Sequence, residues 1–262
     1  MPKDCNSIKD AIKTPLETTS LHLDNKHITE LNESISACKN LEVLYLQQNK
    51  LTTIPEWIGV FKQLKELYLG GNNIENLPES IGELTQLKIL SLGENPIRKL
   101  PDSIGNLKNL EILKLEDGKL SEIPETLSEL SHLTELDLFR NPIKTFLNNV
   151  SGLTKLKSLN ISQTALEVFP EAIFQLVTLE YLAICSDNIT EIPSSINKLQ
   201  NLNNLILSGC PITTLPESIK ELQHINELSL YDTKIPVELA RTLFKEWPSV
   251  KMISHSDAYL SR

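Results

Sequence analysis

The sequence LKELYLGGNNIENLPESIGELTQ, from Leu64 to Gln86, is one copy of a unit that recurs along the chain every 23 residues. The copies begin at Thr18, Leu41, Leu64, Leu87, Leu110, Leu133, Leu156, Leu179, Leu202 and Ile225, and the register does not slip between them. Because each copy of a short repeat contacts chiefly its neighbours, the repeat decides the architecture before chain length does. The positions of each unit are numbered below as slots 1 to 23.

Each unit follows the pattern LxxLxLxxNxLxxLPxxIxxLxx. Slot 4 is leucine in all ten units, from Leu21 to Leu228, and slot 11 is always leucine or isoleucine. The alternation around slots 4 and 6 predicts a short strand with one apolar face. A single unit cannot bury that face, so we expect the units to stack and to pair their strands into a parallel sheet.

The rest of the unit predicts turns. Proline at slot 15, usually followed by an acid as in PESI from Pro78 to Ile81, favours the first position of a short helical or 3-10 turn. Slot 9 is asparagine in several units, at Asn49, Asn72, Asn95 and Asn141. We expect these amides to be buried and to bond the backbone of their own and the neighbouring coil. Leu147 replaces proline in the unit that begins at Leu133, so the turn of this unit is the least predictable.

These residues resemble leucine-rich repeats. The resemblance implies an α/β fold, a right-handed leucine-rich-repeat solenoid or horseshoe. Its concave face would be a parallel β-sheet, its convex face short helical or 3-10 turns, and both ends would carry helical caps. The expected organisation is an N-terminal cap helix over residues 1–17, ten coils over residues 18–235 with the last incomplete, and a C-terminal cap helix and tail over residues 236–262.

The two ends depart from the repeat, as the exposed ends of a solenoid require. In SIKDAIKTP, Ser7 and Asp10 form a capping-box-like start for a helix that would end before Pro15. Ile8, Ala11 and Ile12 would form its apolar face. Near the other end, PVELARTLFKEWPSV places an apolar stripe on a helix, with Trp247 as the cap anchor. A short strand is expected over residues 251–254, followed by a frayed tail.

The composition narrows the classes of partner that the chain is expected to bind. With 34 acidic against 25 basic residues the formal charge is −9, which argues against binding to nucleic acid or to an anionic membrane surface. No apolar run is long enough to insert into a membrane. The chain as written carries no signal peptide, which predicts a cytoplasmic protein, or a secreted or surface-associated one if it is a trimmed mature form. We expect a protein partner and a monomer, with a weak homodimer as the alternative.

The stretch DAIKTPLETTSLHLDNKHIT resembles the start of bacterial leucine-rich-repeat-only proteins of the spirochaete type. Ala11 to Pro15 and Thr19 to Leu23 stand where that group has a short helix and its first strand. Such proteins are commonly exported or surface-associated, and the resemblance implies a host or envelope protein as partner. The LPxxIxxL coil is also similar to cytoplasmic regulators of the Ras pathway and to phosphatase scaffolds, which implies a signalling scaffold instead.

The sequence contains none of the usual catalytic or metal-binding motifs, so we predict no enzyme, no metal and no cofactor. The five histidines are scattered, and no Cys/His zinc spacing occurs. Cys5 and Cys38 are expected to be separate buried thiols, although a disulfide joining the cap to the first coil is the alternative. Cys185 is expected on the concave face and Cys210 in the inward ladder, so the two should not pair.

Since the leucines are committed to the core, specificity must lie in the slots that project from the sheet. The aromatic zone comprises Val43, Tyr45, Tyr68, Ile89 and Ile112, beside a hollow expected at Gly70, Gly71 and Gly93. The acidic zone comprises Glu94, Glu116, Asp117, Glu135 and Asp137, with Lys114, Phe139 and Arg140 among them. The C-terminal zone comprises Tyr181, Ile206 and Tyr231, among Asn160, Asn203, Asn204 and Asn226.

The function predicted from these zones is a non-catalytic module that binds a protein through the concave face. The predicted contact residues are Val43, Tyr45, Glu66, Tyr68, Ile89, Ile112, Glu116, Glu135, Asp137, Phe139, Arg140, Tyr181, Ile206 and Tyr231. The simpler interpretation is that tyrosine and isoleucine are good strand residues and stack across strands. A metal- or carbohydrate-dependent binder that uses the acidic and asparagine residues is a further alternative. On the convex side, Trp57 and Phe174 are expected to be exposed.

Overall fold

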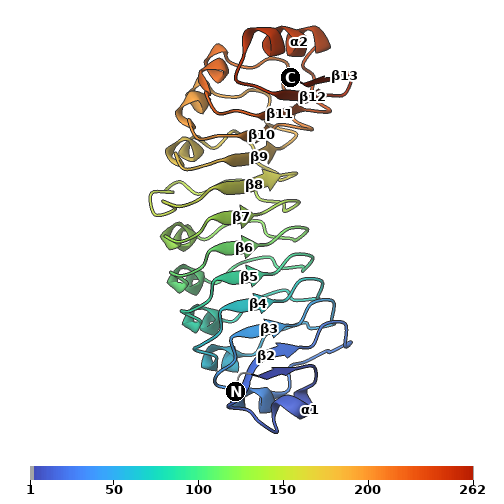
Figure 1. Ribbon diagram of the computed structural model, residues 1–262, viewed down its shortest axis with the longest axis vertical. Helices are drawn as coiled ribbons and strands as arrows, with labels where there is room; N and C mark the ends of the chain where they lie inside the picture. Colours follow the sequence, from blue (N-terminus) through green and yellow to red (C-terminus); the bar gives the residue numbers. More distant parts are fainter. Residues whose placement is uncertain (1–2, 262) are drawn as a thin grey trace.

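The computed structural model describes residues 3–261, so residues 1, 2 and 262 at the ends of the expected caps lie outside the described residues. It is a solenoid in which one sheet runs from end to end and is not closed (Figure 1). Strands follow one another in chain order from β1 to β13, and all neighbours pair in parallel except β12 with β13. The strands stack along the long axis of the molecule, with the turns on one side of the stack (Figure 1).

The strands are short. They are β1 Lys3–Cys5, β2 Thr18–His22, β3 Val43–Tyr45, β4 Glu66–Tyr68, β5 Ile89–Ser91, β6 Ile112–Lys114, β7 Glu135–Asp137, β8 Ser158–Ser162, β9 Tyr181–Cys185, β10 Asn204–Ile206, β11 Glu227–Leu230, β12 Met252–His255 and β13 Ala258–Ser261. Between β2 and β11 the register advances by one repeat per strand, as in Leu44 opposite Leu67 and Leu67 opposite Leu90. These leucines are fully buried, which confirms the strand and its apolar face.

The turns are 3-10 helices. They are η1 Glu33–Ala37, η2 Glu56–Val60, η3 Glu79–Glu83, η4 Asp102–Asn106, η5 Glu125–Glu129, η6 Glu171–Gln175, η7 Ser194–Lys198 and η8 Glu217–Glu221. From η2 on, each begins directly after the slot-15 proline, whose missing N–H is not needed there. The unit with Leu147 has no such turn in the described chain, and the stack of turns is interrupted between β7 and β8 (Figure 1).

The buried asparagines bond the coils together. The Asn72 amide nitrogen donates to the carbonyls of Leu46 and Leu69 at 2.9 and 2.8 Å, and its Oδ1 accepts the Leu51 N–H at 3.0 Å. The same set of bonds recurs at Asn49, Asn95 and Asn141. One side chain therefore satisfies backbone groups of two consecutive coils, as predicted for slot 9.

Slot 8, just before this asparagine, turns the chain out of the strand. Gln48 has φ of 54° and Gly71 has φ of +68°, both in the left-handed region. Glu94, Asp117 and Arg140 adopt the same conformation at the equivalent position. Left-handed backbone is strained for residues with a Cβ, so the bonds of the buried asparagine help to hold each turn in place.

The N-terminal cap differs in part from the expectation. The helix α1 spans only Ile8–Ala11, and Ser7 caps it, accepting the Asp10 N–H at 3.2 Å. Ala11 is buried, but Ile12, expected on the same apolar face, is exposed because the helix ends before it. The strand β1, which the sequence did not predict, pairs with the edge of β2. The cap therefore hydrogen-bonds the backbone of the first coil and also covers its core.

At the C-terminal end, the helix α2 spans Val237–Glu246, and Trp247 is buried as the expected anchor. Its indole nitrogen donates to the Leu222 carbonyl at 3.2 Å. The strand expected near residue 251 is β12, but the tail after it does not fray. It folds back as β13, which pairs antiparallel with β12 because the last parallel strand would otherwise leave a free edge.

Replacing Asn72 with alanine should destabilise the protein by roughly 2 kcal/mol or more, because buried carbonyl and N–H groups of two coils lose their partner. Urea denaturation measures the loss. Asn73→Ala is the matched control, since the Asn73 side chain next in sequence is exposed. Equal losses in both variants would contradict the structural role of the Asn72 amide.

Candidate functional site

The exposed face of the sheet carries the residues of slots 3, 5 and 7, because alternate side chains of a strand point to opposite faces. In β4, Leu67 points into the core while Glu66 and Tyr68 on either side are half-buried. The other predicted contact residues lie on the same face or at its rim: Val43, Tyr45, Ile89, Ile112, Glu116, Glu135, Asp137, Phe139, Tyr181 and Ile206 are half-buried, and Arg140 and Tyr231 are exposed. The structure thus brings the predicted residues together on one surface, and their binding role stays a prediction.

A column of stacked rings dominates the N-terminal part of this face. Tyr45 and Tyr68 are opposite each other in β3 and β4, with ring centroids 4.9 Å apart and planes within 2°. His22 in β2 extends the stack onto Tyr45 at 4.5 Å. The repeat aligns these rings, since one register step separates equivalent side chains of neighbouring coils. His22 was not among the predicted contact residues, although it shares slot 5 with both tyrosines.

Tyr68 is held by a second contact. Its hydroxyl donates to Glu66 Oε2 at 2.8 Å, within the same strand. Burial and this bond to a carboxylate raise the pKa of Tyr68 to about 12. Burial also raises the pKa of Tyr45. The stack on Tyr45 and the hydrogen bond to Glu66 together fix the position of the Tyr68 ring.

The hollow expected beside the glycines is largely filled. A Cβ on Gly71 would meet the Gln48 amide, and a Cβ on Gly93 would meet the Glu116 carboxylate. Side chains of the neighbouring coils thus lie over the two glycines. Gly70 alone has only its neighbours' backbone and a serine hydroxyl beside it, so the surface next to Tyr68 is shallow rather than hollow.

The acidic zone is partly neutralised within the chain. Lys114 pairs with Glu135 at 3.1 Å, which raises the pKa of Lys114, and Arg140 pairs with Asp117 at 3.3 Å. Asp137 lies opposite Lys114 and accepts the Phe139 N–H at 2.9 Å. Burial raises the pKa of the Asp137 carboxyl.

Glu116 is the least satisfied group of this zone. It is half-buried over Gly93, and its Oε2 is buried without a hydrogen-bond partner among the described residues. Burial raises the pKa of its carboxyl above the ordinary value. Arg140, in the next coil, stacks its guanidinium over the Phe139 ring at 4.8 Å and donates to Gln163 at 2.7 Å, so its charge is already engaged.

The C-terminal zone is more polar. Asn204 donates to Glu227 at 2.8 Å, and Asn226 donates to Asn203 at 3.0 Å. Burial raises the pKa of Tyr181, whereas Tyr231 projects freely, with 59% of its surface exposed. No aromatic stack joins these residues to one another in the described structure, so this zone lacks the order of the aromatic zone.

Charge is distributed unevenly between this face and the rest of the molecule. Slots 3, 5, 7 and 8 of the ten coils hold nine acidic residues, namely Asp24, Glu66, Glu94, Glu116, Asp117, Glu135, Asp137, Glu227 and Asp232. The same slots hold only two basic residues, Lys114 and Arg140. Most of the net charge of −9 therefore lies on one face, and the remainder of the chain is almost balanced.

Two predictions for the opposite side are wrong. Phe174 is only 4% exposed and stacks on Phe169 at 5.2 Å, beside the unit that has no turn. Trp57 is half-buried and packs edge-on against Phe61 at 6.1 Å. Each ring packs against another ring of its own coil, a contact that slot positions alone do not reveal.

The four cysteines are free and buried. Cys5 lies 3.7 Å from the Thr18 hydroxyl, and Cys38 contacts the Ala11 carbonyl at 3.9 Å. Cys185 is buried rather than exposed on the sheet face, and its hydrogen bond with Cys210 raises the pKa of Cys210. The two thiols form no disulfide, as expected, although the turn after β10 brings Cys210 back under β9, where its thiol donates to the Ile184 carbonyl at 3.3 Å.

Within residues 3–261, no three histidine, cysteine or acidic side chains are grouped closely enough to hold a metal ion. No helix in that range has the length and apolar character needed to cross a membrane.

Three leucine-rich-repeat family models match the sequence. They are a leucine-rich repeat region over residues 58–169 and leucine-rich repeats over residues 17–74 and 201–222. A search of curated proteins finds no match. The chain is a leucine-rich-repeat protein, as its repeat, its sheet and these matches agree.

Solved structures with the same fold come from plants and bacteria. The plant peptide hormone receptor RGFR1, solved in complex with RGF2, is 28% identical over 97% of this chain, with a TM-score of 0.78. An internalin from Listeria monocytogenes is 21% identical over 97% of this chain and 77% of its own, with a TM-score of 0.69. This chain spans 42% of the receptor chain.

A Leptospira interrogans leucine-rich-repeat protein is 20% identical, covering 97% of this chain and 100% of its own with a TM-score of 0.43. The resemblance to spirochaete-type proteins therefore stays a prediction.

In a spectrophotometric titration of tyrosine, Tyr68 should ionise with a pKa of about 12, above its ordinary value of 10.0. Glu66→Gln should lower this pKa, because the hydroxyl loses its bond to a carboxylate. Because the pKa of Tyr68 is higher in the folded than in the unfolded state, this group's contribution to the free energy of unfolding is fully present below pH 10. It is lost as the pH rises through about 12. Tyr68→Phe should remove the part of the titration that occurs near pH 12. If that part persists in the variant, its assignment to Tyr68 is wrong.

Proposed function

We propose that this chain is a non-catalytic protein-binding module whose partner docks on the exposed face of the sheet. The observation that carries the proposal is the stack of His22, Tyr45 and Tyr68. Half-buried aromatic rings on a rigid sheet offer large contact area, and little side-chain freedom is lost when a partner binds. The bond from Tyr68 to Glu66 adds to this order.

The charge of the face supports a partner with a basic surface. Nine acidic and two basic residues share the slots that face outward, and the two basic ones are already paired with Glu135 and Asp117. Such a surface attracts positively charged partners from solution and repels acidic ones. In this proposal the aromatic zone supplies most of the affinity, and the acidic zone supplies selectivity and speed of association.

The likeness to RGFR1 supports a protein or peptide ligand, since that receptor was solved in complex with RGF2 and is 28% identical to this chain. Leucine-rich-repeat domains are typically binding modules without catalytic activity, which supports a binding role for this chain. The partner, the compartment and the monomeric state remain part of the proposal.

A photo-crosslinking amino acid placed at Ser91, directly opposite Tyr68, should capture the partner from an extract of the source organism.

Tyr45→Ala combined with Tyr68→Ala should then weaken binding of the purified partner on the order of tenfold to a hundredfold, because the contact area of the stack is lost. Calorimetry measures the affinity. Val177→Ala, an exposed apolar side chain between η6 and β9, should have no effect. Unchanged affinity in the double variant would exclude the aromatic zone as the interface.

Glu116→Gln combined with Asp137→Asn should slow association several-fold and flatten its dependence on salt, since two charges facing the partner are removed. Stopped-flow measurements at low and high ionic strength test this. The control pair, Glu83→Gln with Glu129→Gln, removes the same charge from turns η3 and η5. Equal slowing by both pairs would show that net charge, rather than this face, guides the partner.

A further inference from the structure

Four departures from the repeat meet at one place on the side of the turns. Phe146 and Phe169 occupy slot 14, where the other complete units have leucine or isoleucine. Leu147 replaces the slot-15 proline, and Phe174 occupies slot 19, which is glycine at Gly59, Gly82 and Gly105. All four side chains are buried. Departures from a regular pattern are expected at functional or strained sites.

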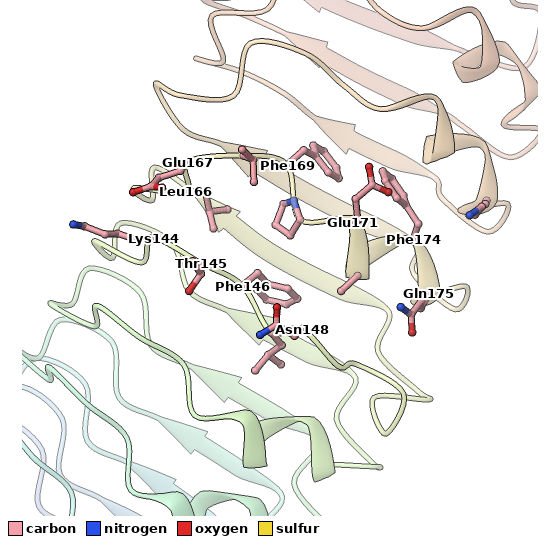
Figure 2. Close-up of a pocket in the computed structure, with 15 residues that line it drawn as sticks. Lys144, Thr145, Phe146, Asn148, Leu166, Glu167, Phe169, Glu171, Phe174 and Gln175 are labelled. Atoms are coloured by element: carbon pink, nitrogen blue, oxygen red, sulfur yellow. The ribbon is translucent and has the colours of Figure 1, made fainter.

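These residues line a hollow of about 660 Å³ between the turnless segment and η6. Phe169 and Phe174 stack with planes within 5°, and Phe146 lies across the hollow from them (Figure 2). The volume lies within the range of about 300–1,000 Å³ that ligand sites occupy. In the regular coils the turns of neighbouring units pack directly on one another, and the hollow at the starts of η3 and η4 is smaller, about 230 Å³.

The hollow continues along the next coil. A second hollow of about 310 Å³ shares Glu167, Val168, Phe169 and Glu171 with the first and extends to Pro193. Val168, at the junction of the two, is 72% exposed, although it is apolar. Together they form an elongated groove rather than a closed cavity, which suits an extended chain better than a compact molecule.

The rim of the groove carries charges of both signs. Lys144, Glu167, Glu171 and Lys198 line the larger hollow, and none of them belongs to an ion pair within residues 3–261. Elsewhere on the turns such side chains pair between coils, as in Lys62 with Glu83 and Lys108 with Glu129. A bound segment with both acidic and basic side chains would form ion pairs with these four residues.

We propose that this groove binds an extended peptide segment of a protein partner. One aromatic or aliphatic side chain would insert between Phe146 and the Phe169–Phe174 stack, and flanking charged residues would pair with the rim. The aromatic walls supply the apolar contact, the unpaired charges orient the segment, and the length of the groove accommodates its backbone. This site goes beyond the proposed function, because it lies on the turns and not on the exposed face of the sheet.

The test is a selection of peptides from a random dodecapeptide library displayed on phage, with the full chain immobilised as target. A variant with a restored turn, Leu147→Pro with Asn148→Glu and Asn149→Ser, serves as soluble competitor. It recreates the PES sequence found at Pro78 to Ser80 and should close the hollow. A second variant, Phe169→Leu, returns slot 14 to its usual residue and leaves the turn unchanged.

Fluorescence anisotropy then measures the affinity of the enriched peptides. The proposal expects a shared aromatic or aliphatic residue flanked by charges, at least a tenfold loss of affinity for both variants, and no loss for Tyr45→Ala with Tyr68→Ala. It is overturned if no peptide is enriched, or if the restored-turn variant, shown to be folded by circular dichroism, binds as well as the parent chain. Full displacement by N-acetyl-phenylalaninamide at peptide-like concentrations would also overturn it, since a single residue would then account for binding.

Discussion

The leucines of one coil can be buried only by the leucines of the next coil, and every other feature of the molecule follows from this constraint. Stacking the coils brings their backbone turns into the interior, where each unpaired N–H or carbonyl destabilises the fold. The slot-9 asparagines resolve this conflict, since Asn72 bonds groups of both its own coil and the preceding one. Apolar stacking and amide bonding therefore depend on each other, and neither would be stable without the other.

The same register that stacks the leucines also aligns whatever lies on the outer face of the strands. Tyr45 and Tyr68 become parallel rings without any contact that selects them individually, because one step of the repeat separates them. Acidic side chains accumulate on this face in the same way, while the turns pair lysines with glutamates between coils. In a repeat protein, residues that occupy the same slot in consecutive units lie side by side on the surface. Changes at those slots therefore alter whole zones of the surface while the architecture stays the same.

Much of the fold could be predicted from the sequence. The period, the strand at slots 4 and 6, the asparagine bonds and the Trp247 anchor are local consequences of a pattern repeated ten times. The strands β1 and β13 could not be predicted, because they depend on free sheet edges rather than on the pattern of the residues that form them. The predicted contact residues were placed on one face, but the side chains of Gln48 and Glu116 over the glycines were not foreseen.

The sequence by itself determined the architecture and the identity of the outward-facing residues, because a fixed period leaves one way to bury the leucines. Only the tertiary structure decided how side chains of different coils meet. It showed that the Gln48 side chain lies over Gly71, that Cys185 reaches Cys210, and that Arg140 pairs with Asp117. These contacts join residues of neighbouring coils or depend on local turns, and their geometry is set by packing that no single unit of the repeat contains.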